Sequence, residues 1–128
     1  MTIKPGAANK KSRPGRLRIV AGKWRSRLLD IADAPGLRPT SERVRETVFN
    51  WLAPLIQGAR CLDLFAGSGA LGFEALSRGA ASVVFVDNSG SAIKAIEKSA
   101  RALEAAGADI HRGDAADYVR NARPASLD

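Results

Sequence analysis

The sequence contains one cysteine and one histidine, Cys61 and His111, among its 128 residues. A single cysteine excludes an internal disulfide and a cysteine-rich zinc site. A single histidine argues against a histidine-based metal centre and against a histidine-dependent catalytic triad. No apolar run approaches the roughly 20 residues of a membrane-spanning helix, and the first residues lack the apolar stretch of a signal peptide. We therefore expect a cytoplasmic protein without a metal site and without a membrane partner.

Acidic residues are absent from the first 29 positions, which carry nine basic side chains. The formal net charge of the whole chain is +7, so the positive excess lies in its first quarter. This asymmetry is typical of a protein that binds a polyanion, most often nucleic acid. A solubilising tail and an organelle transit peptide are the alternatives, although two Pro-Gly pairs would interrupt the helix of a transit peptide. The residues predicted to contact nucleic acid are Arg16, Arg18, Lys23, Arg25, Arg27 and, by stacking on a base, Trp24.

The chain divides into three predicted regions. Residues 1–15 form a basic lead-in that we expect to be disordered. Residues 16–58 are predicted to form a basic β-hairpin and a helix, an extension that contacts nucleic acid. Residues 59–128 are predicted to form an α/β half-domain.

Two kinds of hydrophobic spacing occur in the region 16–58. Residues 16–20 alternate basic and apolar side chains as strands do, which places Leu17 and Ile19 on one face, and residues 27–31 follow as the second strand of a short hairpin. A helix then runs from Thr40, whose hydroxyl can cap its first turn, to about residue 52. The side chains that we expect to face the core from this helix are Val44, Val48, Trp51, Leu52 and Leu55.

The region 59–128 repeats a pattern of buried strand, polar turn and helix. Strands are predicted at 59–66, 81–87 and 108–114, and helices at 69–78, 89–106 and 115–121. Gly107 is predicted to end the second of these helices. Glu74, on the first, is predicted to be solvated at the surface or paired within its helix, and not to be catalytic. Three successive β–α units predict the first half of a doubly wound, parallel, Rossmann-like sheet. Ligands of such sheets bind beyond the carboxyl ends of the strands.

The turn after the first of these strands, from Asp63 to Gly72, is rich in glycine. Its spacing matches G-x-G-x-x-G, in which the backbone approaches a nucleotide closely. A dinucleotide is disfavoured because Asp63 would lie near its pyrophosphate and repel it. S-adenosylmethionine fits better, since it offers an ammonium group to Asp63, a ribose to Asp87 and an adenine amine to Asp114. The dinucleotide remains an alternative, as does capping of a helix by one of these aspartates.

The segment DLFAGSGALGFEALSRGA resembles motif I of class I S-adenosylmethionine-dependent methyltransferases. Upstream, RLRIVAGKWRSRLL and GLRPTSERVRETVFNWL resemble the N-terminal region of bacterial 16S rRNA (guanine(966)-N(2))-methyltransferases. That family methylates the exocyclic amine of a guanine in small-subunit ribosomal RNA. The donor-binding residues that the resemblance implies are Asp63, Gly67, Ser68, Gly69, Asp87, Asn88, Asp114 and Ala115, with Thr40 and Arg43 at the border of the pocket. The resemblance also implies that the hairpin and Arg38 bind 16S rRNA or a precursor of the small ribosomal subunit, as part of a monomeric enzyme.

One motif of that family is missing from the sequence. The resemblance implies a fourth strand ending in Asp/Asn-Pro-Pro-Tyr/Phe, which orients the target amine and stacks on the flipped base. No Pro-Pro pair occurs in the chain, so no catalytic residue is assigned. We therefore expect the N-terminal portion of a longer enzyme, inactive alone and restored by a separately supplied C-terminal part. A non-catalytic RNA-binding module and a fragment of a nicotinamide-dependent oxidoreductase are the alternatives.

Overall fold

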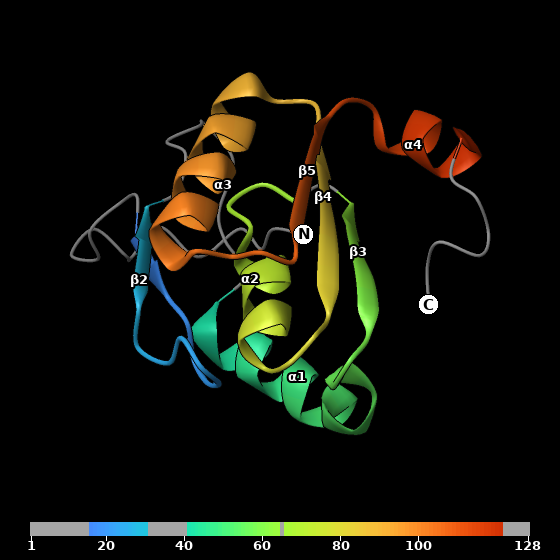
Figure 1. The fold of residues 1–128 in the computed structure, drawn as a ribbon. Helices are drawn as coiled ribbons and strands as arrows, with labels where there is room; N and C mark the ends of the chain where they lie inside the picture. The colour runs from blue at the N-terminus through green and yellow to red at the C-terminus, as the bar shows by residue number, and fades with distance from the viewer. Residues whose placement is uncertain (1–15, 31–40, 65, 122–128) are drawn as a thin grey trace.

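The computed structural model describes residues 16–30, 41–64 and 66–121, which form a hairpin, a parallel sheet and four helices (Figure 1). The hairpin strands are β1 (Arg16–Arg18) and β2 (Leu28–Asp30), and the sheet strands are β3 (Arg60–Leu64), β4 (Ser82–Asp87) and β5 (Ala108–Arg112). The helices are α1 (Glu42–Ile56), α2 (Ala70–Ser77), α3 (Gly90–Leu103) and α4 (Ala115–Asn121). The predicted lead-in lies outside the described residues, as do Arg38 and Thr40. Among the described helices, none has the length and apolar character needed to cross a membrane.

The sheet confirms the predicted succession of strands and helices. Its strands are parallel and hydrogen-bonded in the order β3–β4–β5. The helices α2 and α3 lie on one side of the sheet and α4 lies toward the other (Figure 1). Because the strands are parallel, their carboxyl ends meet at one edge, which is where the predicted donor-binding residues begin.

The core between α2 and the sheet is built from aromatic and β-branched side chains. Phe73 on α2 and Phe85 on β4 are fully buried, with ring centroids 4.8 Å apart. Ile96 on α3 and Val83 on β4 are also 0% exposed. Burial of this apolar surface supplies the main favourable term for docking the helices.

Helix α3 ends earlier than predicted. The helix ends at Leu103, and Glu104 adopts the left-handed conformation, with φ 52°, that was expected of Gly107. Gly107 is needed for another reason, since a Cβ there would lie 2.6 Å from the carbonyl oxygen of Ala81. This glycine therefore permits a close approach between backbones at the start of β5 and is not a helix cap.

The hairpin packs its apolar face against the rest of the molecule. Leu17 pairs with Leu29 across the two strands, and both side chains are buried, as is Ile19. Trp24 is also buried, at 8% exposure, and it belongs to the hydrophobic core cluster. The prediction that Trp24 stacks on a base is therefore wrong, because its ring already packs in the protein interior. The ammonium of Lys23 lies 4.7 Å from the centroid of that ring.

Helix α1 buries a face other than the one its apolar spacing predicts. Its N-cap is Ser41, whose hydroxyl accepts a hydrogen bond from the Val44 N–H. Arg45, Phe49 and Ile56 are its buried residues. Trp51 is 76% exposed. The predicted core face of this helix is therefore wrong. Val44, Leu52 and Leu55 are exposed as well, and Val48 is half-buried.

The orientation of α1 follows from a buried ion-pair cluster around Glu74. The Glu74 carboxylate is 0% exposed, and it accepts hydrogen bonds from Arg45 Nε at 3.3 Å and Arg78 Nε at 2.9 Å. The backbone N–H groups of Val20 and Ala21 each donate to it at 3.0 Å. Burial lowers the pKa of Arg45, and the Glu74 carboxylate opposes that shift. The cluster therefore ties α1, α2 and the hairpin together. Of the two roles predicted for Glu74, its i,i+4 pair with Arg78 matches the pairing within a helix, whereas its burial excludes solvation at the surface.

Candidate functional site

Two aspartates from neighbouring strands hold the glycine-rich turn at the carboxyl edge of the sheet. Asp63 on β3 accepts a hydrogen bond through Oδ2 from the Gly72 N–H at 3.2 Å. Asp87, the last residue of β4, accepts through Oδ2 from the Gly67 N–H and through Oδ1 from the Ser89 N–H, both at 2.8 Å. The carboxylates therefore fix both ends of the turn and concentrate negative charge beside it.

Asp63 is the buried member of this pair. Its side chain is 8% exposed, and burial raises the pKa of the carboxyl to about 6. The nearby Asp87 carboxylate adds to the rise in pKa, and the hydrogen bond from Gly72 opposes it. A cationic group placed beside Asp63 would offset both the cost of burying the charge and the repulsion from Asp87, and would thus favour the ionised carboxylate.

Replacing Asp63 by asparagine is expected to remove a pH dependence of stability. The native carboxyl keeps its proton to about pH 6, whereas the unfolded one loses it near its ordinary value of 3.8. The native state thus binds more protons in this window, and wild-type stability falls as pH rises through it. The variant should not show this fall and should gain roughly 2 kcal/mol over the wild type by neutral pH.

Urea unfolding at a series of pH values between about 4 and 7 measures this difference. Glu97→Gln is the matched control, because Glu97 is exposed on α3 and has no ion-pair partner within the described residues. Equal pH slopes for the wild type and Asp63→Asn would contradict the expected linkage.

Three more of the predicted donor residues, Ser68, Asn88 and Asp114, lie around the same edge, in varied surroundings. The Ser68 hydroxyl accepts a hydrogen bond from the Ala70 N–H at 3.2 Å, next to Gly69 at the N-terminus of α2. Asp114 accepts from the Asp117 N–H at 3.0 Å and thereby caps α4, the structural role that we expected for one of the aspartates. Asn88 is exposed and follows Asp87 directly.

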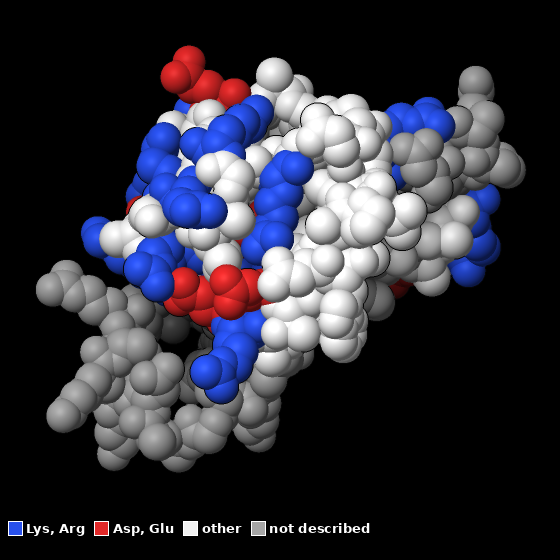
Figure 2. All heavy atoms as spheres, turned by 90° about the horizontal axis from the view of Figure 1, so that it is seen from below, with Lys and Arg blue, Asp and Glu red and all other residues white. Residues whose placement is uncertain are grey.

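The basic residues predicted on the hairpin form part of a cationic surface, but most have partners within the protein. Arg16 pairs with Asp30 at 3.6 Å, and Arg18 pairs with Glu42 at 2.7 Å. Arg27 donates to a backbone carbonyl of α3 at 3.1 Å. Figure 2 shows Lys and Arg side chains gathered on one part of this face, beside a broad area without charged side chains.

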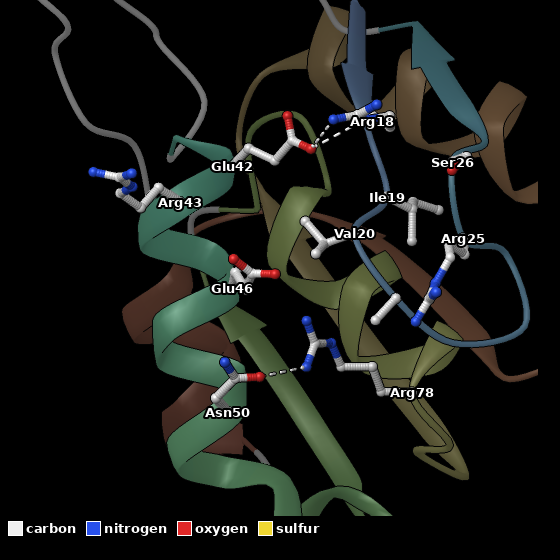
Figure 3. Close-up of a pocket in the computed structure, with 11 residues that line it drawn as sticks. Arg18, Ile19, Val20, Arg25, Ser26, Glu42, Arg43, Glu46, Asn50 and Arg78 are labelled. Carbon is white, nitrogen blue, oxygen red and sulfur yellow. Dashed lines mark hydrogen bonds and ion pairs between the residues drawn. The ribbon is translucent and has the colours of Figure 1, made fainter.

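An open cavity of about 720 Å³ lies between the hairpin and α1 (Figure 3). It brings together two residues predicted for RNA, Arg18 and Arg25, with one predicted for the donor, Arg43. It also contains residues that the sequence did not single out for function: Glu42, Glu46, Asn50 and Arg78. The spacing of Glu42, Glu46 and Asn50 along α1, four residues apart, could have indicated a shared polar face. In the described ranges, no group of three or more His, Cys, Asp or Glu side chains could hold a metal ion.

Comparison with known proteins assigns the chain to a family. Residues 17–128 match the family model described as conserved hypothetical protein 95. The chain belongs to this family. Ribosomal RNA small subunit methyltransferase D of Escherichia coli K12 is 49% identical over 105 residues, which are 82% of this chain and 53% of that protein. The predicted resemblance to the family of small-subunit rRNA methyltransferases is thereby confirmed, and the chain spans about half the length of the curated relatives it matches.

Solved structures of family members and of more distant methyltransferases share the fold. Methyltransferase yhhF from Escherichia coli superposes with a TM-score of 0.76 and 44% identity, over 82% of this chain and 56% of that one. A Trypanosoma brucei PRMT1 enzyme–prozyme complex with AdoHcy has a TM-score of 0.53 and 28% identity, over 63% of this chain and 25% of that one. The described α/β unit is thus the first half of a Rossmann-like methyltransferase fold, as predicted.

Proposed function

We propose that this chain supplies the donor-binding half of an S-adenosylmethionine-dependent methyltransferase that modifies N2 of a guanine in 16S rRNA. The observation that carries the proposal is the pair of carboxylates, Asp63 and Asp87, on either side of the glycine-rich turn. The names of the relatives support the acceptor class, rRNA. In this proposal, residues 59–121 bind the donor and residues 16–58 contact the RNA.

The residues at this edge suit S-adenosylmethionine in charge and in hydrogen-bonding capacity. Asp63 is a buried carboxylate that a cation would stabilise, and the donor carries an ammonium group. Each oxygen of the Asp87 carboxylate accepts one hydrogen bond from a described backbone N–H, so each keeps a lone pair for a ribose hydroxyl. Asp114 and Ala115 follow β5 and would border the adenine. The bound donor would supply an activated methyl group on sulfur.

The same contacts count against the nicotinamide-dependent oxidoreductase. A pyrophosphate in a dinucleotide fold binds the free N–H groups of the glycine-rich turn at the helix N-terminus. Here the Gly67 N–H already donates to the Asp87 carboxylate, and Asp63 lies at the beginning of the turn. Two carboxylates at that place would repel a pyrophosphate.

The orienting groups for the acceptor amine are a separate requirement. The sequence holds no Asp/Asn-Pro-Pro-aromatic motif. Alignment of the amine with the methyl group is the main source of rate in such a displacement. We therefore propose that the 128-residue chain binds the donor but transfers no methyl group without this motif from another polypeptide segment.

Binding of S-adenosylhomocysteine to the purified chain tests the proposed function. Isothermal titration should show binding to the wild type and a loss of at least ten-fold in Asp87→Ala, which removes a charged hydrogen-bond acceptor. Asp87→Glu should retain most of the affinity, since a carboxylate is still present at the strand end. Asp109→Ala, an exposed aspartate on β5, is the matched control and should bind as the wild type does.

Two results of this titration would overturn the proposal. One is tighter binding of NAD than of S-adenosylhomocysteine, which would favour the oxidoreductase. The other is an absence of S-adenosylhomocysteine binding by a folded wild-type chain, which would favour a non-catalytic RNA-binding module.

A further inference from the structure

We infer that the cavity between the hairpin and α1 binds the sugar–phosphate backbone of RNA, with phosphates on Arg25 and Arg43 and a ribose hydroxyl on Glu46. The inference rests on the proposed function and deepens it, because it locates the RNA in a cavity and not on the outer face of the hairpin. The volume of about 720 Å³ lies within the range of roughly 300–1,000 Å³ that is usual for ligand sites.

The partners of the arginines separate those that hold the protein together from those that face solvent. In the cavity, Arg18 makes two hydrogen bonds to Glu42 Oε1, at 2.7 and 2.9 Å. Arg78 donates to Glu74 at 2.9 Å and to Asn50 at 3.4 Å. Within the described residues, neither Arg25 nor Arg43 has an ion-pair partner, so both guanidinium groups remain available to phosphates.

The two available arginines approach the cavity from different elements. Arg25 projects from the hairpin turn, whereas Arg43, on the first turn of α1, points its guanidinium away from the hairpin, toward the outer side of the helix (Figure 3). Guanidinium groups bind phosphate oxygens with two parallel N–H donors and stay charged at all working pH values. A strand that met both arginines would therefore cross the mouth of the cavity and continue over the first turn of α1.

Glu46 gives this cavity a feature that a simple phosphate site lacks. It lies one turn beyond Glu42 on α1, lines the cavity, and has no ion-pair partner within the described residues. A carboxylate repels phosphate but accepts a hydrogen bond from a ribose 2′-hydroxyl, the group that distinguishes RNA from DNA. Its place between cationic side chains thus favours RNA over DNA of the same sequence.

Affinity for labelled oligouridylate, measured by fluorescence anisotropy over a range of salt concentrations, tests the phosphate contacts. Arg25→Glu and Arg43→Glu should each weaken binding about ten-fold and lower the slope of log affinity against log salt by about 0.7. Lys94→Glu on α3 is the matched control, because it makes the same charge change on an exposed helix outside the cavity. An equal loss in Lys94→Glu would mean that net charge alone governs binding and would overturn the inference.

Oligodeoxyuridylate of the same length tests the contact of Glu46. The wild type should prefer the ribose oligomer, and Glu46→Ala should reduce this preference several-fold, while Glu97→Ala on the exposed face of α3 should not change it. An unchanged preference in Glu46→Ala would overturn that part of the inference.

Titration of every variant with S-adenosylhomocysteine tests the RNA-binding cavity separately from the proposed methyltransferase function. Normal RNA affinity in Arg25→Glu and Arg43→Glu, with donor affinity retained in Arg25→Glu, would overturn the cavity and leave the proposed function intact. A wild-type chain that binds oligouridylate through these arginines but not S-adenosylhomocysteine would uphold the cavity and overturn the methyltransferase assignment.

Discussion

Replacement of Glu74 by glutamine is expected to lower the free energy of unfolding by about 3–5 kcal/mol, because it removes the carboxylate that balances the buried charge of Arg45. The glutamine is nearly the same size, so the loss does not come from a cavity. Arg45 is 1% exposed and cannot recover its hydration without moving α1. The amide nitrogen of the glutamine would also face N–H donors from Arg78 and from the hairpin backbone.

Urea unfolding at neutral pH measures this loss. Glu97→Gln, the same exchange at an exposed site on α3, should change the stability by less than about 0.5 kcal/mol. The double variant Glu74→Gln/Arg45→Met should be more stable than the sum of the two single losses predicts, because removing both charges leaves neither unpaired. A loss of less than about 1 kcal/mol in Glu74→Gln would show that the cluster does not hold the hairpin.

Replacement of Gly22 by alanine is expected to detach the hairpin turn from α2. A Cβ at Gly22 would lie 2.0 Å from the carbonyl oxygen of Ser77, and the φ of 91° is unfavourable for any residue with a side chain. The turn must move, and three contacts with Ser77 would be lost: the Lys23 N–H to its carbonyl at 2.9 Å, the Trp24 N–H to its hydroxyl at 3.0 Å, and its hydroxyl to the Ala21 carbonyl at 2.6 Å.

Gly58→Ala separates the cost of the backbone conformation from the cost of the collision. Gly58 also has a positive φ, 76°, but nothing lies within 4 Å of a Cβ built there. The control should lose about 1–2 kcal/mol from backbone strain, and Gly22→Ala should lose at least twice as much. In a Trp51→Phe background, the fluorescence of Trp24 reports its exposure directly. An unchanged emission maximum of Trp24 in Gly22→Ala would show that its ring stays buried, and this would contradict the detachment of the turn.

The α/β unit could be predicted from the sequence because its signals are local. Each strand is a short segment with apolar residues, β4 being rich in β-branched ones, and each turn carries glycine or aspartate at the carboxyl end of its strand. Asp63, Gly67 and Asp87 were placed at one edge by the rule that parallel strands end together, and the structure does bring them together. Their predicted contacts with a donor remain a proposal, which the titrations above test.

The packing of α1 and of the hairpin could not be predicted in the same way. Apolar spacing shows which side chains share a face of α1, but it does not show which face the rest of the protein covers. That choice depends on Arg45 reaching Glu74, a carboxylate 29 positions away in the sequence. The base stacking predicted for Trp24 is wrong for a similar reason. The sequence does not show the contact of its turn with Ser77, which accompanies the packing of its ring in the core.

Helix α2 connects the two proposed binding regions through its opposite ends. Its first turn contains Gly72, which donates to Asp63, and its later residues Glu74 and Ser77 hold the hairpin. Eight residues of helix span only about 12 Å, so a displacement at one end reaches the other as a rigid-body movement. If donor binding shifts α2 and thereby strengthens RNA binding, RNA must strengthen donor binding by the same factor, because the coupling free energy is reciprocal. The order in which the donor and the RNA bind would then change the pathway to the ternary complex but not the free energy of its formation.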